Sequence, residues 1–222
     1  MPSYYLSYEP IPQSAYAKGD IAVAFWEIVS QRHNAKKFNG KKINNEKITE
    51  LFDIIRMAPS ADNLQPWKIK VISDRNTLDK LTPATPPFNQ EKMRTCSHLL
   101  VFCADQDLEM RWSRVESAAR QAGLPGREIT HMAGVANMIL NRSPEERLNR
   151  SQRDVFLAAG NAINGASSLG FDSSIIGSFN PKEFTRILKL PRTLEPTLII
   201  AIGYAADTPP QKLRFSKEDV FF

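Results

Sequence analysis

The chain of 222 residues is poor in the residues that build metal sites, disulfide frameworks and hydrolytic centres. Its two cysteines, Cys96 and Cys103, are seven positions apart, a spacing that matches no zinc motif and gives no disulfide framework. This cysteine usage favours a reducing, cytoplasmic compartment. The three histidines, His33, His98 and His131, are scattered along the chain. Because there is also no His-Glu-x-x-His motif and no Gly-x-Ser-x-Gly elbow, metalloenzyme and hydrolase functions have little support.

Long apolar runs and a glycine-rich phosphate loop are also missing. No apolar run is long enough to span a bilayer, and residues 1–20 lack the basic-then-apolar order of a signal peptide, so we expect no membrane partner. The net charge of +5 is spread along the chain without a basic run or a nucleic-acid motif, so we expect no nucleic-acid partner either. Binding of anionic small molecules would explain the positive net charge equally well.

The chain length and the lack of an interdomain linker predict a single domain over residues 1–222, with an N-terminal arm at 1–19 and a C-terminal extension at 205–222. Helices are expected at 21–31, from Asn44 to about Met57, around Leu78, and at 108–122, 129–141, 144–169 and 181–188. Strands are expected from Trp67 onward and at 97–104, 172–177 and 197–204, with a proline-rich loop at 83–87. This loose alternation of helices and strands is typical of an α+β or an α/β fold.

Five polar or cationic patches are distributed along the chain, at 32–36, 60–65, 89–92, 177–178 and 212–214. The cations that follow the first helix either complement the negative end of its dipole or form an anion site. The polar turn at 60–65 joins a helix to a strand, and the residues alone favour an ordinary connection over a loop that grips a ligand. Patches so dispersed suit an enzyme whose cofactor carries the difficult chemistry.

Two further features concern packing surfaces. The helix at 144–169 contains small residues that allow another helix to approach closely, either within the chain or from a second subunit: Ala158, Ala159, Gly160, Ala162, Gly165 and Ala166. The last residues, Val220 to Phe222, are apolar, and we expect a protein surface to cover them.

In their order along the chain, the patches resemble the motifs of the FMN-dependent nitroreductase family, in particular the oxygen-insensitive NAD(P)H nitroreductases and the related dihydropteridine reductases. Residues 32–36 (Arg-His-Asn-Ala-Lys) are similar to the family's Arg-His-Ser-x-Lys element, and residues 58–67 to its Pro-Ser-x-x-Asn-x-Gln-Pro-Trp element. Residues 89–93 fit the family's Asn-x-x-Lys-Met element, and residues 212–214 fit its C-terminal Lys-x-Arg. The resemblance spans roughly residues 25–214.

The resemblance implies an α+β fold with a central, mainly antiparallel sheet flanked by helices. It implies FMN as cofactor, NADH or NADPH as electron donor, and a homodimer with two flavin sites at the subunit interface. The C-terminal tail is implied to be exchanged onto the partner, which would cover the apolar end of the chain. Segment 108–150 is implied to cover the pocket.

The resemblance also assigns FMN contacts to individual residues. The phosphate end falls to Arg32, His33, Lys212 and Arg214, the pyrimidine edge to Lys36, and the pyrimidine and ribityl oxygens to Asn89 and Lys92. The backbone at Ile176, Gly177 and Ser178 is implied to face flavin N5. Four residues, Pro59, Ser60, Ala61 and Asn63, are implied to come from the neighbouring chain, near the dimethylbenzene edge of the flavin.

Two positions depart from the family pattern. Asn34 lies within the cofactor-binding segment where the family usually has serine, which exchanges a hydroxyl for an amide. Gly177 stands where the enteric members have glutamate. Flavin binding survives at that position if only the backbone N–H matters, whereas the preference between donors changes if the carboxylate shapes the nicotinamide site.

The implied function is an NAD(P)H oxidoreductase that works by ping-pong hydride transfer through flavin N5. Nitroaromatics, quinones or other small electron-poor molecules are the implied acceptors. A dihydropteridine or enone reductase of the same family is the alternative, and a non-catalytic basic binding protein is the alternative from a different class. We name no catalytic side chain, because the cofactor supplies the reacting atoms.

Overall fold

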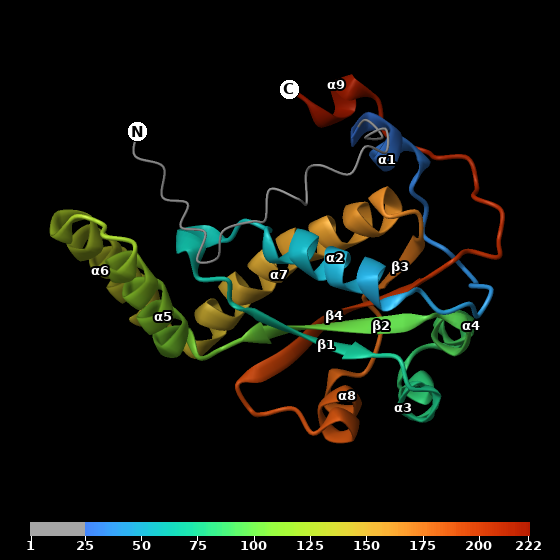
Figure 1. Cartoon of the computed structure of the whole chain (residues 1–222), viewed down its shortest axis with the longest axis horizontal. Helices are drawn as coiled ribbons and strands as arrows, with labels where there is room; N and C mark the ends of the chain where they lie inside the picture. The colour runs from blue at the N-terminus through green and yellow to red at the C-terminus, as the bar shows by residue number, and fades with distance from the viewer. Residues whose placement is uncertain (1–24) are drawn as a thin grey trace.

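The structure, a computed structural model, describes residues 25–222. The arm expected at 1–19 and the first four residues of the helix expected at 21–31 lie outside the described residues. The described part of that helix is α1 (Phe25–Gln31). A second short helix, α9 (Lys217–Val220), lies near the C-terminus (Figure 1).

A four-stranded sheet forms the centre of the molecule (Figure 1). Its strands, in spatial order, are β1 (Trp67–Ile72), β2 (His98–Asp105), β4 (Leu194–Gly203) and β3 (Asp172–Ile176). Every neighbouring pair is antiparallel. The two central strands are almost fully buried because helices cover both faces of the sheet, which confirms the prediction of an α+β fold with an antiparallel sheet flanked by helices.

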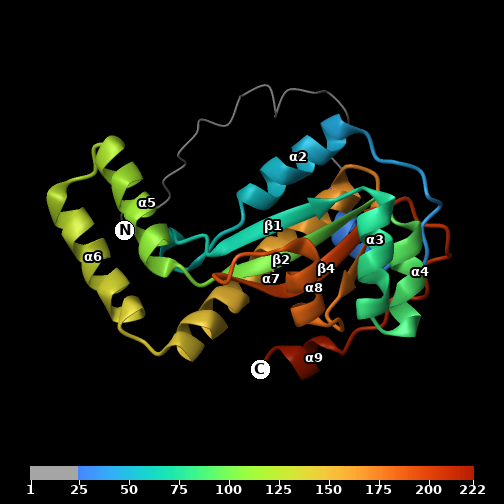
Figure 2. The same cartoon turned by 90° about the horizontal axis from the view of Figure 1, so that it is seen from below.

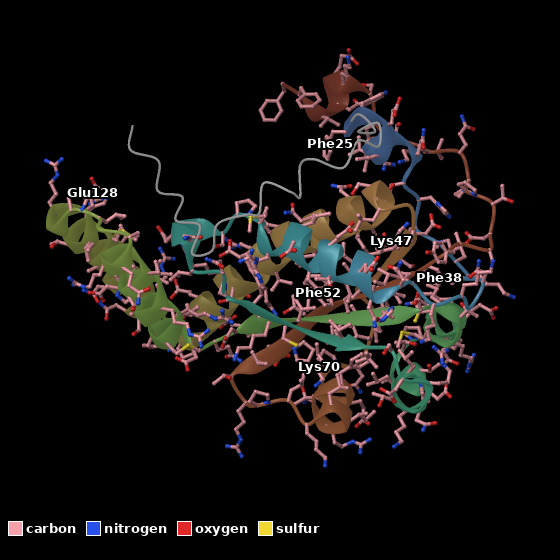
Figure 3. All side chains as sticks on the ribbon, in the orientation of Figure 1. Phe25, Phe38, Lys47, Phe52, Lys70 and Glu128 are labelled. Carbon is pink, nitrogen blue, oxygen red and sulfur yellow. The ribbon has the colours of Figure 1, made fainter. Side chains whose placement is uncertain are left out.

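One face of the sheet is covered by α2 (Asn45–Arg56) and by the long helix α7 (Pro144–Ser168). Leu51 of α2 and Ala162 of α7 belong to the same buried core as Phe102 of β2. At Gly165 an added Cβ would lie 2.8 Å from a methyl carbon of Ile54, so this small residue is required by packing within the chain. The ammonium group of Lys47 donates to the carbonyl of Leu169 at 2.7 Å and joins α2 to the end of α7 (Figure 3).

The opposite face is covered by α3 (Arg75–Leu81), α4 (Pro87–Thr95) and α8 (Pro181–Leu188). Leu81, Met93 and Phe184 pack there against Val101 and Ile199 of the central strands. The proline-rich loop expected at 83–87 is shorter than predicted. Residues 82–84 form the 3₁₀ turn η3 (Thr82–Ala84), and Pro87 begins α4, since proline fits the first position of a helix.

A helical hairpin of α5 (Leu108–Gln121) and α6 (Gly126–Leu140) projects from one end of the sheet (Figures 1 and 2). It carries a small core of its own, in which Val115 and Ile139 pack against Leu64 from the turn before β1. The turn and the hairpin are therefore packed together although they are far apart in sequence.

Most expected helix starts are confirmed by their caps. The side chains of Asn44, Asp74 and Asn180 accept backbone N–H groups in the first turns of α2, α3 and α8, and Ser143 forms a capping box with Glu146. The last strand begins at Leu194 rather than at the expected Thr197. It includes Pro196 because a bulge at that point removes the need for a backbone donor.

Candidate functional site

The segment after α1 lies along the edge strand β3. The backbone N–H of Ala35 donates to the carbonyl of Ser173 at 3.1 Å, and the side-chain oxygen of Asn34 accepts the N–H of Ile175 at 2.7 Å. A backbone N–H at the sheet edge is thereby satisfied by a side chain. The amide at position 34, one of the two departures from the family pattern, is thus used to fix the segment to the sheet.

The same segment also pairs with the chain that follows β4. The N–H of Asn39 donates to the carbonyl of Tyr204 at 2.9 Å, and the N–H of Ala206 donates to the carbonyl of Lys37 at 2.9 Å. Beyond this pairing, the carboxylate of Asp207 accepts the backbone N–H groups of Lys36 and Lys37. This pairing brings the 32–37 segment and the C-terminal extension together.

Three predicted phosphate-binding cations gather where these two segments meet. The Lys212 ammonium donates to the carbonyls of Val29 and Arg32, at 2.6 and 2.7 Å, at the C-terminal end of α1. Burial lowers the pKa of Arg32, and repulsion by Arg214 lowers it further. Partial burial also lowers the pKa of Lys212, together with repulsion by Arg32 and Arg214. These cations repel one another, so a bound anion would relieve them.

A second pair of cations adjoins the first group. Lys92 and Asn89 are buried on α4, and the Lys92 ammonium donates to the side-chain oxygen of Asn89 at 2.7 Å. Burial lowers the pKa of Lys92 and the nearby Lys36 lowers it further, while the negative charge of Asp207 opposes both effects. We refer to the set of Arg32, Lys36, Lys92, Lys212 and Arg214 as the cationic end of the sheet.

His33 lies within the cationic end between two carboxylates. Its Nδ1 is 3.8 Å from Asp172, and its Nε2 is 3.7 Å from Asp207. Within residues 25–222 this buried Nε2 has no hydrogen-bond partner. A ligand atom could complete the bonding of this nitrogen, which suits the predicted role of His33 at an anion site.

The second candidate region is the turn at residues 58–66, called the turn end below. Within it η2 (Ala61–Asn63) forms one turn of 3₁₀ helix. The hydroxyl of Ser60 accepts the N–H of Gln65 at 2.9 Å, and the Gln65 side chain donates to Asn63. Asp62, Asn63 and Gln65 all have left-handed backbone conformations, with φ of 55°, 53° and 47°. Hydrogen bonds within the turn therefore shape it, as in an ordinary connection. Its backbone nevertheless has a left-handed conformation that residues other than glycine rarely adopt.

Two residues of α7 contact the turn end. The carboxylate of Asp154 accepts the N–H of Ala61 at 3.2 Å, and burial raises the pKa of Asp154. Arg150 forms an ion pair with Asp62. Sequence reasoning did not select Asp154, because a single acid inside a helical pattern gives no local signal of its contact with a turn 93 residues away.

The two regions lie at opposite ends of the sheet within one chain. Trp67 pairs with Ala104, which pairs with Glu195, whereas Gly203 lies beside Asp172 at the other end. Eight residues of β4 separate the two ends, which corresponds to about 25 Å. The structure therefore brings the predicted cations together, and it does not bring Pro59, Ser60, Ala61 or Asn63 to them.

The remaining predicted segment follows β3. Ile176 is buried at the end of the strand, opposite Ile199, while Gly177 and Ser178 are exposed. An added Cβ at Gly177 would meet nothing within 4 Å, so glycine at this position is not required by packing in the chain.

The described residues contain neither a candidate metal site nor a candidate membrane-spanning helix. No group of three or more histidine, cysteine, aspartate or glutamate side chains is arranged to hold a metal ion in residues 25–222. Across the same residues, none of the helices combines the length and the apolar character needed to cross a membrane.

Comparisons with known proteins agree with the fold. The family model described as Nitroreductase family matches residues 29–204. An oxygen-insensitive NADPH nitroreductase of Helicobacter pylori is 27% identical over 197 residues, which cover 87% of this chain and 93% of the relative.

Two solved structures match this one over nearly their whole length. A Staphylococcus epidermidis protein described as an NAD(P)H:FMN oxidoreductase has a TM-score of 0.81 and 26% identity, and the match covers 91% of this chain and 97% of that one. An Exiguobacterium sibiricum protein described as a nitroreductase in complex with FMN also has a TM-score of 0.81. Its match covers 90% of this chain and 97% of that one, and at 23% identity it supports the fold alone.

Proposed function

This chain belongs to the nitroreductase family, and on that premise we propose that it is an FMN-dependent oxidoreductase using NADH or NADPH as electron donor. Its acceptors are nitroaromatics, quinones or similar small electron-poor molecules. When bound, FMN carries two electrons from the donor to the acceptor, so the chain's own residues bind and orient rather than react.

The mutual repulsion of the cationic end carries this proposal. Arg32, Lys212 and Arg214 hold like charges close enough to lower the pKa of Arg32 and of Lys212. Such an arrangement costs stability unless an anion is bound, and the phosphate dianion of FMN has the charge to offset it. Lys36 and Lys92 form a second positive group beside it, suited to the electron-rich pyrimidine edge of a reduced flavin.

The turn end completes the site of a second subunit in this proposal. About 25 Å of sheet separates the turn from the cations of its own chain, so one chain cannot place both against a single flavin. A homodimer that sets the turn of one chain beside the cations of the other resolves this separation. Ser60 and Asn63 then lie on a turn whose backbone is already fixed by its internal bonds.

Exposed apolar side chains support the dimer. Trp26 of α1, Phe52 of α2 (Figure 3) and Phe156 of α7 are solvent-accessible within the chain, at 77%, 39% and 56%. Phe215 and the last residues, Val220 to Phe222, are exposed as well. A partner surface covering these residues would bury the apolar area that a stable subunit interface needs. Because Lys212 bonds to its own α1, exchange of the tail would begin beyond this residue.

The first experiment is the visible absorption spectrum of the purified protein, followed by anaerobic addition of NADH and of NADPH. We expect a yellow protein that bleaches with at least one donor, and reoxidation by a quinone then gives turnover. A protein that stays colourless after incubation with FMN would contradict the proposal and favour a non-catalytic basic binding protein.

A mixed dimer tests the shared site. We expect Arg214→Glu to abolish FMN binding from the cationic end and Ala61→Phe, at an exposed position, to abolish it from the turn end. In a mixed dimer one site then carries both changes and the other carries neither, so one of the two sites regains FMN. If each site lay within one chain, the mixed dimer would bind no more FMN than either variant alone.

A further inference from the structure

Asp207 holds a position within the cationic end that the family motifs do not mark. It contacts the backbone of one predicted cofactor cation, Lys36, and its charge acts on another, Lys92. Its carboxylate accepts the backbone N–H of Lys36 at 3.1 Å to each oxygen, and the N–H of Lys37 at 3.3 Å to one of them. Two successive N–H groups thus converge on one carboxylate, as they do in backbone sites for anions.

This contact closes the pairing between two distant parts of the chain. Phe38 forms a bridge with Ala205, and Ala206 donates to the carbonyl of Lys37, so the chain next presents Asp207 to the 36–37 backbone. Two prolines, Pro209 and Pro210, follow and have no backbone N–H with which to extend the pairing. Asp207 is therefore the last attachment before Lys212 reaches the end of α1.

The same carboxylate has basic side chains on several sides. It is 3.7 Å from Nε2 of His33, and its negative charge opposes the lowering of the Lys92 pKa by burial and by Lys36. The carboxylate therefore lies near both Lys36 and Lys92 and offsets part of their repulsion. Replacing it by a neutral group would leave this repulsion without an internal counter-charge.

We propose that Asp207 is a positioning residue that holds the Lys36 backbone in register with Lys92 and sets the local charge felt by the flavin. This inference rests on the proposed function, because the group that Lys36 and Lys92 would serve is FMN. Asp207 itself acts through the backbone of Lys36 and through its charge, without contacting the reacting atoms.

The test compares Asp207→Asn, which keeps the shape and loses the charge, with Asp207→Glu, which keeps the charge. Asp74→Asn is the matched control, since Asp74 also accepts a backbone N–H, from Thr77, but does so as the N-terminal cap of α3. Three quantities are measured: hydrogen exchange of the Lys36 and Lys37 amides without FMN, the Kd for FMN, and the midpoint potential of the bound flavin.

We expect Asp207→Asn to speed exchange of the two amides and weaken FMN binding, each by about tenfold or more, because charge-assisted hydrogen bonds are lost. Its midpoint potential becomes more positive, since removing a negative charge favours the added electron density of the reduced flavin. Asp207→Glu keeps the wild-type potential, and Asp74→Asn matches wild type in all three quantities.

Two results would overturn the inference: an Asp207→Asn protein with wild-type exchange and potential, or an equal loss of FMN affinity in Asp74→Asn. A shift in affinity without a shift in potential would overturn the electrostatic part and leave Asp207 a purely structural contact. Failure of the proposed function is distinguishable, because a wild-type protein that binds no FMN still reports the Asp207 contact through amide exchange.

Discussion

The two ends of the sheet treat charge in opposite ways. At the cationic end, Arg214 lies close enough to Arg32 and Lys212 that its positive charge helps to lower the pKa of both. At the turn end Asp62 is paired with Arg150, and Asp105 with Arg111. Charges that are paired within the chain serve the fold, whereas like charges held together are retained for a ligand. The comparison therefore predicts stability defects at one end and binding defects at the other.

Asp105 joins the turn end to its neighbours. Its backbone N–H donates to the carbonyl of Pro66 at 2.9 Å, and its buried carboxylate accepts Nε of Arg111 at 2.9 Å. Arg111 also donates to the carbonyl of Trp67 at 2.8 Å. Through these bonds the first turn of α5 is attached to the last residue of the turn end and to the first residue of β1.

Arg111→Met gives the largest expected effect. It removes one partner of a buried ion pair and leaves the Asp105 carboxylate, 1% exposed, without its counter-charge. We expect the free energy of unfolding to fall by about 3–5 kcal/mol. Urea unfolding of the apoprotein measures this loss.

Arg120→Met is the matched control on the same helix, because Arg120 forms an exposed pair with Glu116. We expect it to cost less than about 1 kcal/mol. Equal losses in the two variants would show that burial of the Asp105 pair does not matter. They would contradict the view that the charges paired at the turn end serve the stability of the fold.

At the cationic end, Arg214→Ala should weaken ligand binding without reducing stability, which is the opposite of the effect expected for Arg111→Met. Its guanidinium donates only to the adjacent Leu213 carbonyl among the hydrogen bonds of the described residues, and its charge repels Arg32 and Lys212. We expect FMN affinity to fall by about 10- to 100-fold while the stability of the apoprotein is unchanged or slightly higher.

Fluorescence titration of FMN and urea unfolding together check this prediction. Lys182→Ala makes the same change in net charge on α8, on the face of the sheet away from the tail (Figure 1). If Lys182→Ala weakens FMN binding as much as Arg214→Ala does, the effect comes from overall charge and the cationic end is not a specific site.

The sequence allowed the elements to be placed because their signals are local. Hydrophobic periodicity and side-chain caps such as Asn44 and Ser143 depend on residues within one or two turns of a helix. The helix α4 was not predicted, since its first turn lies in a proline-rich segment and its polar residues, Asn89 and Lys92, face inward. Burial of polar residues reverses the pattern from which a helix is recognised.

The candidate site was predictable in part. Family motifs selected Arg32 and Arg214, and the structure places them close together, although 182 positions separate them in sequence. Nothing local marks Asp154 or Asp207, because their roles depend on contacts between distant segments. How the turn end meets a cofactor is a property of two chains, which a single sequence pattern does not specify.

Lys92→Met tests whether a buried cation of the cationic end serves ligand binding rather than stability. Because the pKa of Lys92 is lowered in the folded state, its charged form is disfavoured there at neutral pH, and the cost disappears only as the pH rises above that lowered value. Methionine removes this cost but leaves the Asn89 oxygen without its donor, so the two effects offset each other. We expect FMN affinity to fall by about tenfold, with a change in unfolding free energy below about 1 kcal/mol.

Titration with FMN and urea unfolding measure the two quantities, and Lys80→Met, at an exposed position of α3, is the control. A Lys92→Met protein that is strongly destabilised and binds FMN normally would place Lys92 among the structural charges.

The smallest expected effect concerns a buried histidine, His98, at the start of β2. Burial together with the nearby Lys42 lowers its pKa below the ordinary value of 6.5. Its Nδ1 lies 2.9 Å from the hydroxyl of Ser97, whose oxygen accepts the N–H of Ile43 at 2.8 Å. An uncharged imidazole can accept the hydroxyl proton of Ser97 at this nitrogen.

Since the folded pKa of His98 lies below the unfolded value, its contribution to stability is present above pH 6.5 and is lost as the pH falls through the folded pKa. The slope from this one group is at most about 1.4 kcal/mol per pH unit. Urea unfolding at several values between pH 8 and pH 5 should show a loss on the acid side that His98→Gln makes shallower, while His131→Gln, on the exposed surface of α6, leaves it unchanged. An identical acid limb in wild type and His98→Gln would mean that protonation at this end of the sheet carries no cost, and that its crowding of positive charge is confined to the residues proposed to bind the phosphate.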